Sequence, residues 1–212
     1  MKRIALALVI VFLAGCGAAV EGGLPASSGQ ETLPAATAPQ IPDSKTQPPK
    51  ILMISAAGKE FAVPGSSCVS YTDPATGAGV SGCGDSAAMP PEQLAVLPRA
   101  SNVALLFLDA QVVHPDGCVS EDEQGCIGYV YVRPLGCFHR EVERIPLERG
   151  PDTHWQLDLD VGAYQLDVFA NFAAEDGRTG DVSGTLGLLV DDRAKPAVVP
   201  VDPKLAVCPF HG

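Results

Sequence analysis

The stretch Trp155-Gln156-Leu157-Asp158-Leu159-Asp160-Val161 decides the fold class of this chain, because apolar and polar side chains alternate along it. A period of two places one side of a β-strand on a core and leaves the other side in water. The same period recurs in Tyr164-Gln165-Leu166-Asp167-Val168, and again through Leu186, Leu188 and Val190. The sequence therefore predicts a succession of strands in the last third of the chain.

Further strand patterns precede this stretch. Residues 103–108 are apolar at every position, which predicts a central strand with two apolar faces. Shorter strands are expected at 51–55, 61–63, 94–97 and 127–132. Turn residues separate these runs, and no stretch of twelve or more residues has a clear helical period. The pattern indicates an all-β domain, an antiparallel β-sandwich or barrel.

The segment Asp160-Val161-Gly162-Ala163-Tyr164-Gln165-Leu166 favours the sandwich. It resembles the D-x-G-x-Y-x-C segment of immunoglobulin-like domains, whose tyrosine begins a late strand and bonds back to the loop before it. The resemblance implies an immunoglobulin-like β-sandwich and such a bond from Tyr164. Leu166 stands where those domains keep a cysteine, so the inter-sheet disulfide of antibodies is absent. The alternative interpretation is an ordinary turn before an ordinary strand.

The N-terminus has the order of a secretory signal: the basic residues Lys2 and Arg3, an apolar run over 4–13, and then small residues. The run is about half of the ~20 residues that span a bilayer, so we expect no transmembrane helix. Leu13-Ala14-Gly15-Cys16 resembles a bacterial lipobox. The resemblance implies that residues 1–15 are removed. An ordinary cleaved signal followed by an incidental cysteine is the alternative.

In a lipoprotein of this kind, Cys16 would carry a diacylglycerol thioether and a further acyl chain. Two or more chains anchor a protein stably to a membrane that it does not span. The residue after Cys16 is Gly17, not an acidic residue, and by the same resemblance this favours the outer membrane. In an organism without an outer membrane we expect the outer face of the cell membrane.

The chain after the signal divides into two parts. Residues 16–49 hold six prolines, little charge and many small or polar residues, which predicts a disordered tether that reaches roughly 30 Å or more. Residues 50–212 have the length of one domain. The formal net charge is -11, and this acidity argues against nucleic acid and anionic lipid surfaces as partners.

Six cysteines remain after Cys16, and an even number in an exported protein indicates disulfides. Six cysteines allow fifteen pairings. Proximity in the sequence favours Cys68 with Cys83, Cys118 with Cys126, and Cys137 with Cys208. Zinc ribbons need close C-x2-C pairs, which the sequence lacks.

Taken whole, the chain resembles uncharacterised bacterial exported lipoproteins with a single immunoglobulin-like β-sandwich domain. The resemblance is carried by residues 68–85, the Pro90-Pro91 step, the strand at 162–168 and the later Gly180-Asp181-Val182-Ser183 turn. It covers most of residues 60–190 and implies no particular activity.

No catalytic residue, cofactor or metal site is assigned from the sequence. The acidic cluster Asp116, Glu121, Asp122 and Glu123 and the segment at 176–181 could supply oxygen ligands to calcium, but neither has EF-hand spacing. We interpret them as a solvated loop and a turn. Cys137-Phe138-His139 is similar to part of a blue-copper site, yet all three methionines lie upstream of it. A G-x-S-x-G hydrolase motif is absent.

The sequence therefore favours a lipid-anchored, non-enzymatic binding or structural module of the cell envelope. Its partner would be an envelope protein or a surface polymer, and we expect the two cysteine-bracketed loops to carry the contact. A small-ligand or calcium-binding envelope protein is the second hypothesis, and an envelope hydrolase is the third. The oligomeric state is not encoded in any pattern that we identify.

Overall fold

The structure, a computed structural model, describes residues 43–85, 89–114, 128–137, 139–206 and 208. The chain separates into two units, Met1–Pro39 and Gln40–Gly212, and the described residues belong to the second. Cys16, Cys118, Cys126, His211 and the acidic cluster at 116–123 lie outside the described residues. Within the described part of the chain, no helix has the length and apolar character needed to cross a membrane.

The described residues form thirteen strands and two short 3-10 helices. The strands are β1 (Ile51–Ser55), β2 (Gly58–Phe61), β3 (Val63–Thr72), β4 (Gly79–Gly84), β5 (Gln93–Leu97), β6 (Asn102–Phe107), β7 (Gln111–Val112), β8 (Tyr129–Pro134), β9 (Glu143–Pro146), β10 (Asp152–Gln156), β11 (Gly162–Ala173), β12 (Arg178–Val190) and β13 (Ala197–Pro200). The 3-10 helices are η1 (Asp43–Thr46) and η2 (Pro203–Ala206).

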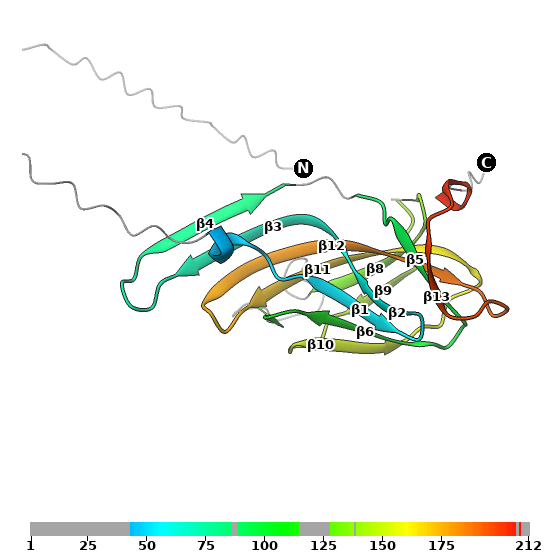
Figure 1. Ribbon diagram of the computed structural model, residues 1–212, viewed down its shortest axis with the longest axis horizontal. Coiled ribbons are helices and arrows are strands. Elements are labelled where there is room, and N and C mark those ends of the chain that lie inside the picture. Colours follow the sequence, from blue (N-terminus) through cyan, green and yellow to red (C-terminus); the bar gives the residue numbers. More distant parts are fainter. Residues whose placement is uncertain (1–42, 86–88, 115–127, 138, 207, 209–212) are drawn as a thin grey trace, which may run out of the picture. The chain divides into compact units, whose positions relative to one another are not determined.

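The strands form two sheets, which pack face to face as a sandwich (Figure 1). One sheet has four strands in the order β10-β6-β1-β2. The other has nine strands and follows the path β13-β5-β12-β11-β8-β9, while β3 pairs with β12 and β4, and β7 pairs with β11. Every pairing is antiparallel except that of β5 with β12. The expected all-β, antiparallel, disulfide-containing fold is thus present.

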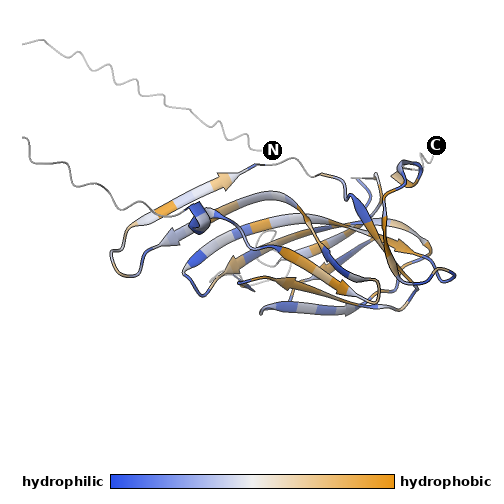
Figure 2. Cartoon of the chain, viewed as in Figure 1, coloured by the Kyte–Doolittle hydropathy of each residue, from blue (hydrophilic) through white to orange (hydrophobic). Residues whose placement is uncertain are grey.

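One hydrophobic cluster fills the space between the sheets. In β6, Val103, Leu105 and Phe107 belong to this cluster, whereas Ala104 and Leu106 lie on the other face of the strand. Figure 2 shows that β1 and β6 are hydrophobic along most of their length, whereas β10 at the edge is hydrophilic. The sequence pattern at 103–108 therefore identified the interior strand correctly, since β6 lies between β10 and β1.

The stretch that opened the sequence analysis is only partly a strand. β10 ends at Gln156, and the backbone amide of Leu157 donates to the carbonyl of Ser101 as the chain leaves the four-stranded sheet. Leu157 and Leu159 are buried in the core, although they lie outside any strand, whereas Val161 is 57% exposed. The alternation therefore predicted burial correctly for the two leucines, but the crossing to the second sheet interrupts the strand.

The segment that we expected to be a loop between Cys68 and Cys83 is instead a β-hairpin. Its strands, β3 and β4, pair in register with Cys68 directly opposite Cys83, and a disulfide joins the two with a Cα–Cα distance of 4.0 Å. These strands are rich in serine and glycine and have no apolar period, so no sequence pattern predicted them. β3 is held by its ladder with β12.

The folded unit also begins earlier than expected. Residues 43–49, which we assigned to the tether, include η1 and the buried Pro49. Lys45 of η1 forms an ion pair with Asp176, and its ammonium lies 5.0 Å from the centre of the Tyr71 ring. The segment is proline-rich, but specific polar contacts to the domain order its last residues.

Candidate binding site at the hairpin end

Two turns lie next to each other at one end of the sandwich, and we call them the hairpin end: 73–78, between β3 and β4, and 174–177, between β11 and β12. In the first turn, the carboxylate of Asp73 accepts a hydrogen bond of 2.8 Å from the backbone amide of Ala75. The second turn contains Gly177 with φ of 88°, and a Cβ built on Gly177 would lie 3.5 Å from the carbonyl oxygen of Thr72. The second turn therefore lies against the end of β3, directly before the first turn.

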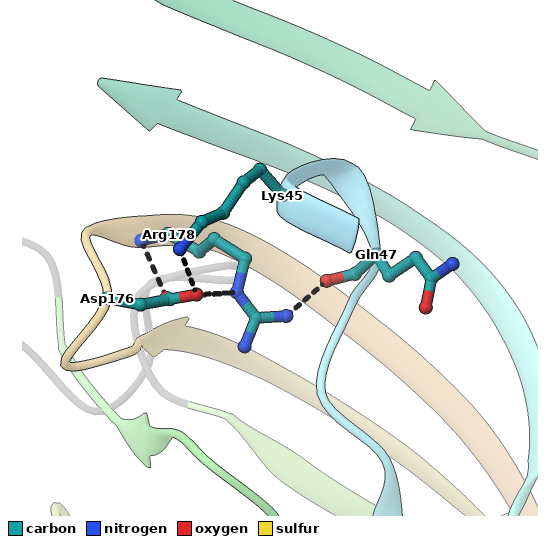
Figure 3. A network of polar contacts seen from close by, with 4 residues as sticks. All are labelled: Lys45, Gln47, Asp176 and Arg178. Atoms are coloured by element: carbon teal, nitrogen blue, oxygen red, sulfur yellow. Dashed lines mark hydrogen bonds and ion pairs between the residues drawn. The ribbon is translucent and has the colours of Figure 1, made fainter. Parts of the chain in front are cut away.

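A polar network fixes the second turn to the chain that enters the domain (Figure 3). Asp176 accepts from the ammonium of Lys45 at 2.9 Å and from Nε of Arg178 at 3.0 Å. Arg178 in turn donates to the carbonyl oxygen of Gln47 at 2.7 Å. Partial burial would raise the pKa of the Asp176 carboxyl, but the hydrogen bonds from Lys45 and Arg178 outweigh it and lower the pKa to about 2. The carboxylate therefore stays charged except in strong acid, and the network persists.

A groove of about 730 Å³ opens beside this network, and we call it the hairpin groove. Its walls come from the turn between β6 and β7, from Pro151, and from the end of β11 with the turn that follows. Three carboxylates line it, those of Asp109, Glu175 and Asp176, against the single guanidinium of Arg178. The groove is thus acidic, and it suits a partner that brings positive charge.

The backbone at Asp109 supports the shape of this groove. Asp109 has φ of 61°, a conformation that is uncommon for residues other than glycine and that aspartate tolerates better than most. The turn closes with a hydrogen bond of 3.2 Å from the amide of Ala110 to the carbonyl of Phe107. The Asp109 side chain is exposed at the groove. The turn thereby presents a carboxylate to solvent from a fixed backbone.

The tyrosine of the immunoglobulin-like segment forms the bond that the resemblance implied. Tyr164 lies near the start of β11, and its hydroxyl donates to the carbonyl oxygen of Asp160 at 2.9 Å. Burial raises the pKa of the Tyr164 hydroxyl, with a further contribution from the Asp160 charge. This residue stabilises the scaffold and does not line the hairpin groove.

Several of the residues that we considered as copper or calcium ligands form a disulfide or hydrogen bonds within the domain. Cys137 is bonded to Cys208, with a Cα–Cα distance of 5.0 Å, so its sulfur is not available as a copper ligand beside His139. In the segment at 176–181, Asp176 is held by the network above and Asp181 accepts from the backbone amide of Cys68. Within the described residues, no three potential ligands are grouped as a metal site would need.

Two further histidines can be placed. His114 has a ring nitrogen 3.3 Å from the carbonyl oxygen of Leu147, and His154 has one 3.2 Å from the carboxylate of Asp152. The two contacts lie on different elements. Neither histidine lines the hairpin groove.

The sequence did not reveal the hairpin groove. Of the two loops that we expected to carry contacts, one is the β3–β4 hairpin and the other, at 118–126, lies outside the described residues. Lys45 and Asp176 are 131 positions apart, and no local pattern relates residues at that separation. The positive φ angle of Asp109, which shapes one wall of the groove, also follows from no pattern in the sequence.

Comparisons with protein-family models, with curated proteins and with solved structures find no match for this chain.

Proposed function

We propose that this chain is a lipid-anchored, non-enzymatic binding module of the bacterial cell envelope. The hairpin groove would hold a positively charged segment of an envelope protein or surface polymer. The observation that carries the proposal is the groove itself: an acidic, open site, one wall of which is the turn after β11 that the Asp176 network holds and that lies against the end of β3. Turns positioned by a rigid sheet scaffold are the usual place for binding residues.

The order of the strands supports an immunoglobulin-like module. In those domains one sheet contains strands A, B and E, and the other contains C, F and G with C′ at its edge. Here β1, β6 and β10 adjoin in the order A-B-E, and β9, β8, β11 and β12 adjoin in the order C′-C-F-G. The Tyr164 bond then falls on the strand in the F position, as in a tyrosine corner. Such domains commonly act in recognition, so this is support by analogy.

The location that we propose is the outer membrane, or the outer face of the cell membrane where there is no outer membrane. The lipobox-like sequence ending at Cys16 is the basis of this proposal. The disulfides Cys68–Cys83 and Cys137–Cys208 of the described part of the chain fit an oxidising compartment, where such bonds persist. The anchor would keep the groove near its partner.

Site-specific photocrosslinking in living cells tests the proposal. A photoreactive residue replaces Gln111, which lines the hairpin groove, in the full chain with an affinity tag. The matched control places the same photoreactive residue at Glu92, an exposed position directly before β5. β5 pairs with the end of β12 that lies opposite to Arg178, so Glu92 is far from the hairpin groove. One crosslinked partner from position 111, absent from position 92, is the expected result.

Two variants complete this experiment. Glu175→Lys reverses one charge of the groove and is expected to abolish the crosslink from position 111, while Cys16→Ala is expected to weaken it because the protein loses its anchor. Equal crosslinking from positions 111 and 92, or a crosslink unchanged by Glu175→Lys, would overturn the assignment of the groove.

A further inference from the structure

A second groove, which we call the edge groove, has a different chemistry. Its volume is about 440 Å³, within the range of sites for small molecules, and it shares no lining residue with the hairpin groove. Three segments line it: the chain before β1, the corner between β2 and β3, and the middle of β12. Apolar side chains predominate among its lining residues, in contrast to the carboxylates of the hairpin groove.

The edge groove reaches the hydrophobic core. Ile51 and Val182, which line it, belong to the core cluster, and Ala62 packs against that cluster. An apolar ligand in the groove would therefore contact the interior of the sandwich from its edge. Prolines 48, 49 and 64 form much of the rim, and their fixed φ angles favour a groove that exists before a ligand arrives.

An irregularity in the sheet shapes the same groove. The β3–β12 ladder shifts register between Val182 and Gly184, so Ser183 lies at a bulge. The hydroxyl of Ser183 donates to the carbonyl of Ser66 at 2.8 Å, and a Cβ added to Gly65 would come within 2.5 Å of this hydroxyl oxygen. The two backbones therefore approach closely here. Bulges occur often beside binding sites, because they redirect side chains.

One cation stands at the rim. Lys50 is the only charged residue among those that line the edge groove, and its ammonium lies 6.0 Å from the centre of the Phe61 ring. Among the described residues, no carboxylate forms an ion pair with Lys50. Phe61 itself is 57% exposed, so its ring is accessible to a ligand in the groove. The groove thus combines an apolar interior with a single cation that lacks a counter-charge.

We propose that the edge groove binds a free single-chain amphiphile with an anionic head group, of the fatty-acid class. The chain would lie against Ile51 and Val182, and the carboxylate would pair with Lys50. The net charge of -11 repels anions in general, so binding of an anion in this groove depends on the local charge of Lys50. The edge groove and the hairpin groove share no lining residue, so this inference and the proposed function can each fail alone.

Calorimetric titration with decanoate tests the inference. The protein is the chain from residue 16 onward with Cys16→Ala, produced without residues 1–15 so that neither the apolar signal segment nor a lipid is present, and the ligand is kept below its micelle concentration. We expect saturable binding of one decanoate per chain. Lys50→Met is expected to weaken binding at least fivefold, whereas Lys59→Met, which removes an exposed lysine two residues before Phe61, should change it less than twofold.

A second variant and a second ligand test whether binding depends on the charge at the groove. Phe61→Glu adds a carboxylate at the rim of the groove on an exposed position, so the fold is retained and decanoate binding should fall at least fivefold. Decyltrimethylammonium has an apolar chain of the same length with a cationic head and should bind at least fivefold more weakly than decanoate. No binding of decanoate, equal binding of the two amphiphiles, or equal effects of Lys50→Met and Lys59→Met would overturn the inference.

A vesicle assay separates a free amphiphile from a lipid surface. Flotation of the same Cys16→Ala chain with phosphatidylglycerol vesicles is expected to recover no more protein than flotation with phosphatidylcholine vesicles. Recovery that depends on phosphatidylglycerol and on Lys50, without binding of decanoate, would instead assign the groove to membrane contact and overturn the inference.

Discussion

Tyr164 connects the strand that it begins to the loop before it, through the hydrogen bond from its hydroxyl to the carbonyl of Asp160. Tyr164→Phe removes this bond and keeps the ring. A hydrogen bond of this kind contributes about 1 kcal/mol, so the free energy of unfolding should fall by that amount and Tm by about 2–4 °C. Urea unfolding measures the change. The control is Tyr131→Phe, on the half-buried outer face of β8, which should leave the free energy of unfolding nearly unchanged. An equal loss of stability in both variants would contradict the role of the Tyr164 hydrogen bond.

Glu60 is a second residue that affects stability by itself, because it makes the free energy of unfolding depend on pH. It lies opposite Met53 on the core side of β2 and is 9% exposed, and one carboxylate oxygen has no hydrogen-bond partner among the described residues. Burial raises the pKa of the Glu60 carboxyl from 4.5 to about 7. The folded state therefore binds the proton more tightly than the unfolded state. The contribution of Glu60 to stability is present below about pH 4.5 and is lost as the pH rises through about 7.

Glu60→Gln should remove this pH dependence. At pH 8 the variant should be more stable than the wild type by about 1–2 kcal/mol, because the wild type must bury a charge there, although solvent at the sheet edge limits the size of the effect. At pH 4 the two proteins should be alike. Urea unfolding across this pH range measures the difference, with the exposed Glu92→Gln as control. A difference between variant and wild type that does not change with pH would exclude Glu60 as its source.

At the scale of the elements, the pairing of β3 with β12 depends on a glycine. Gly180 has φ of 152°, and a Cβ at this position would lie 1.9 Å from the carbonyl oxygen of Cys68. Gly180→Ala should therefore separate the two strands and cost about 2–4 kcal/mol. Gly82→Ala on β4 is the control, since its Cβ would approach nothing closer than Thr46 at 4.0 Å. Hydrogen exchange of the β3 amides localises the effect; slow exchange in the Gly180 variant would contradict it.

At the scale of the whole molecule, the described residues contain two disulfides with very different spans. Cys68–Cys83 closes 15 residues and Cys137–Cys208 closes 71. In the chain-entropy account, the longer loop contributes about 4 kcal/mol and the shorter about 3 kcal/mol. The double variant Cys137→Ser with Cys208→Ser should therefore lose more stability than Cys68→Ser with Cys83→Ser. Denaturant unfolding of the two variants measures the order, and each serves as control for the other. The reverse order would show that loop length does not govern the contribution.

The sequence by itself determined the fold class, the burial of alternating side chains and two cysteine pairs. Alternation is a local property: it assigns Leu157 and Leu159 to the core whether or not a strand continues through them. The continuous apolar run at 103–108 predicted β6, and the period of two at 164–168 predicted β11. Proximity in the sequence suggested the Cys68–Cys83 pair, and Cys137–Cys208 was predicted as the remaining pair of the same set; both are present.

Only the tertiary structure decided where the candidate sites lie. The ion pair of Lys45 with Asp176 joins residues 131 positions apart. Lys50, Phe61 and Val182 meet at the edge groove because β2 pairs with β1 and leads directly into β3, which pairs with β12. β3 forms a ladder with β12, and β4 in turn pairs with β3, although the sequences of both strands have no apolar period. Local alternation specifies which face of a strand is buried, but the neighbours of a strand follow from the path of the whole chain.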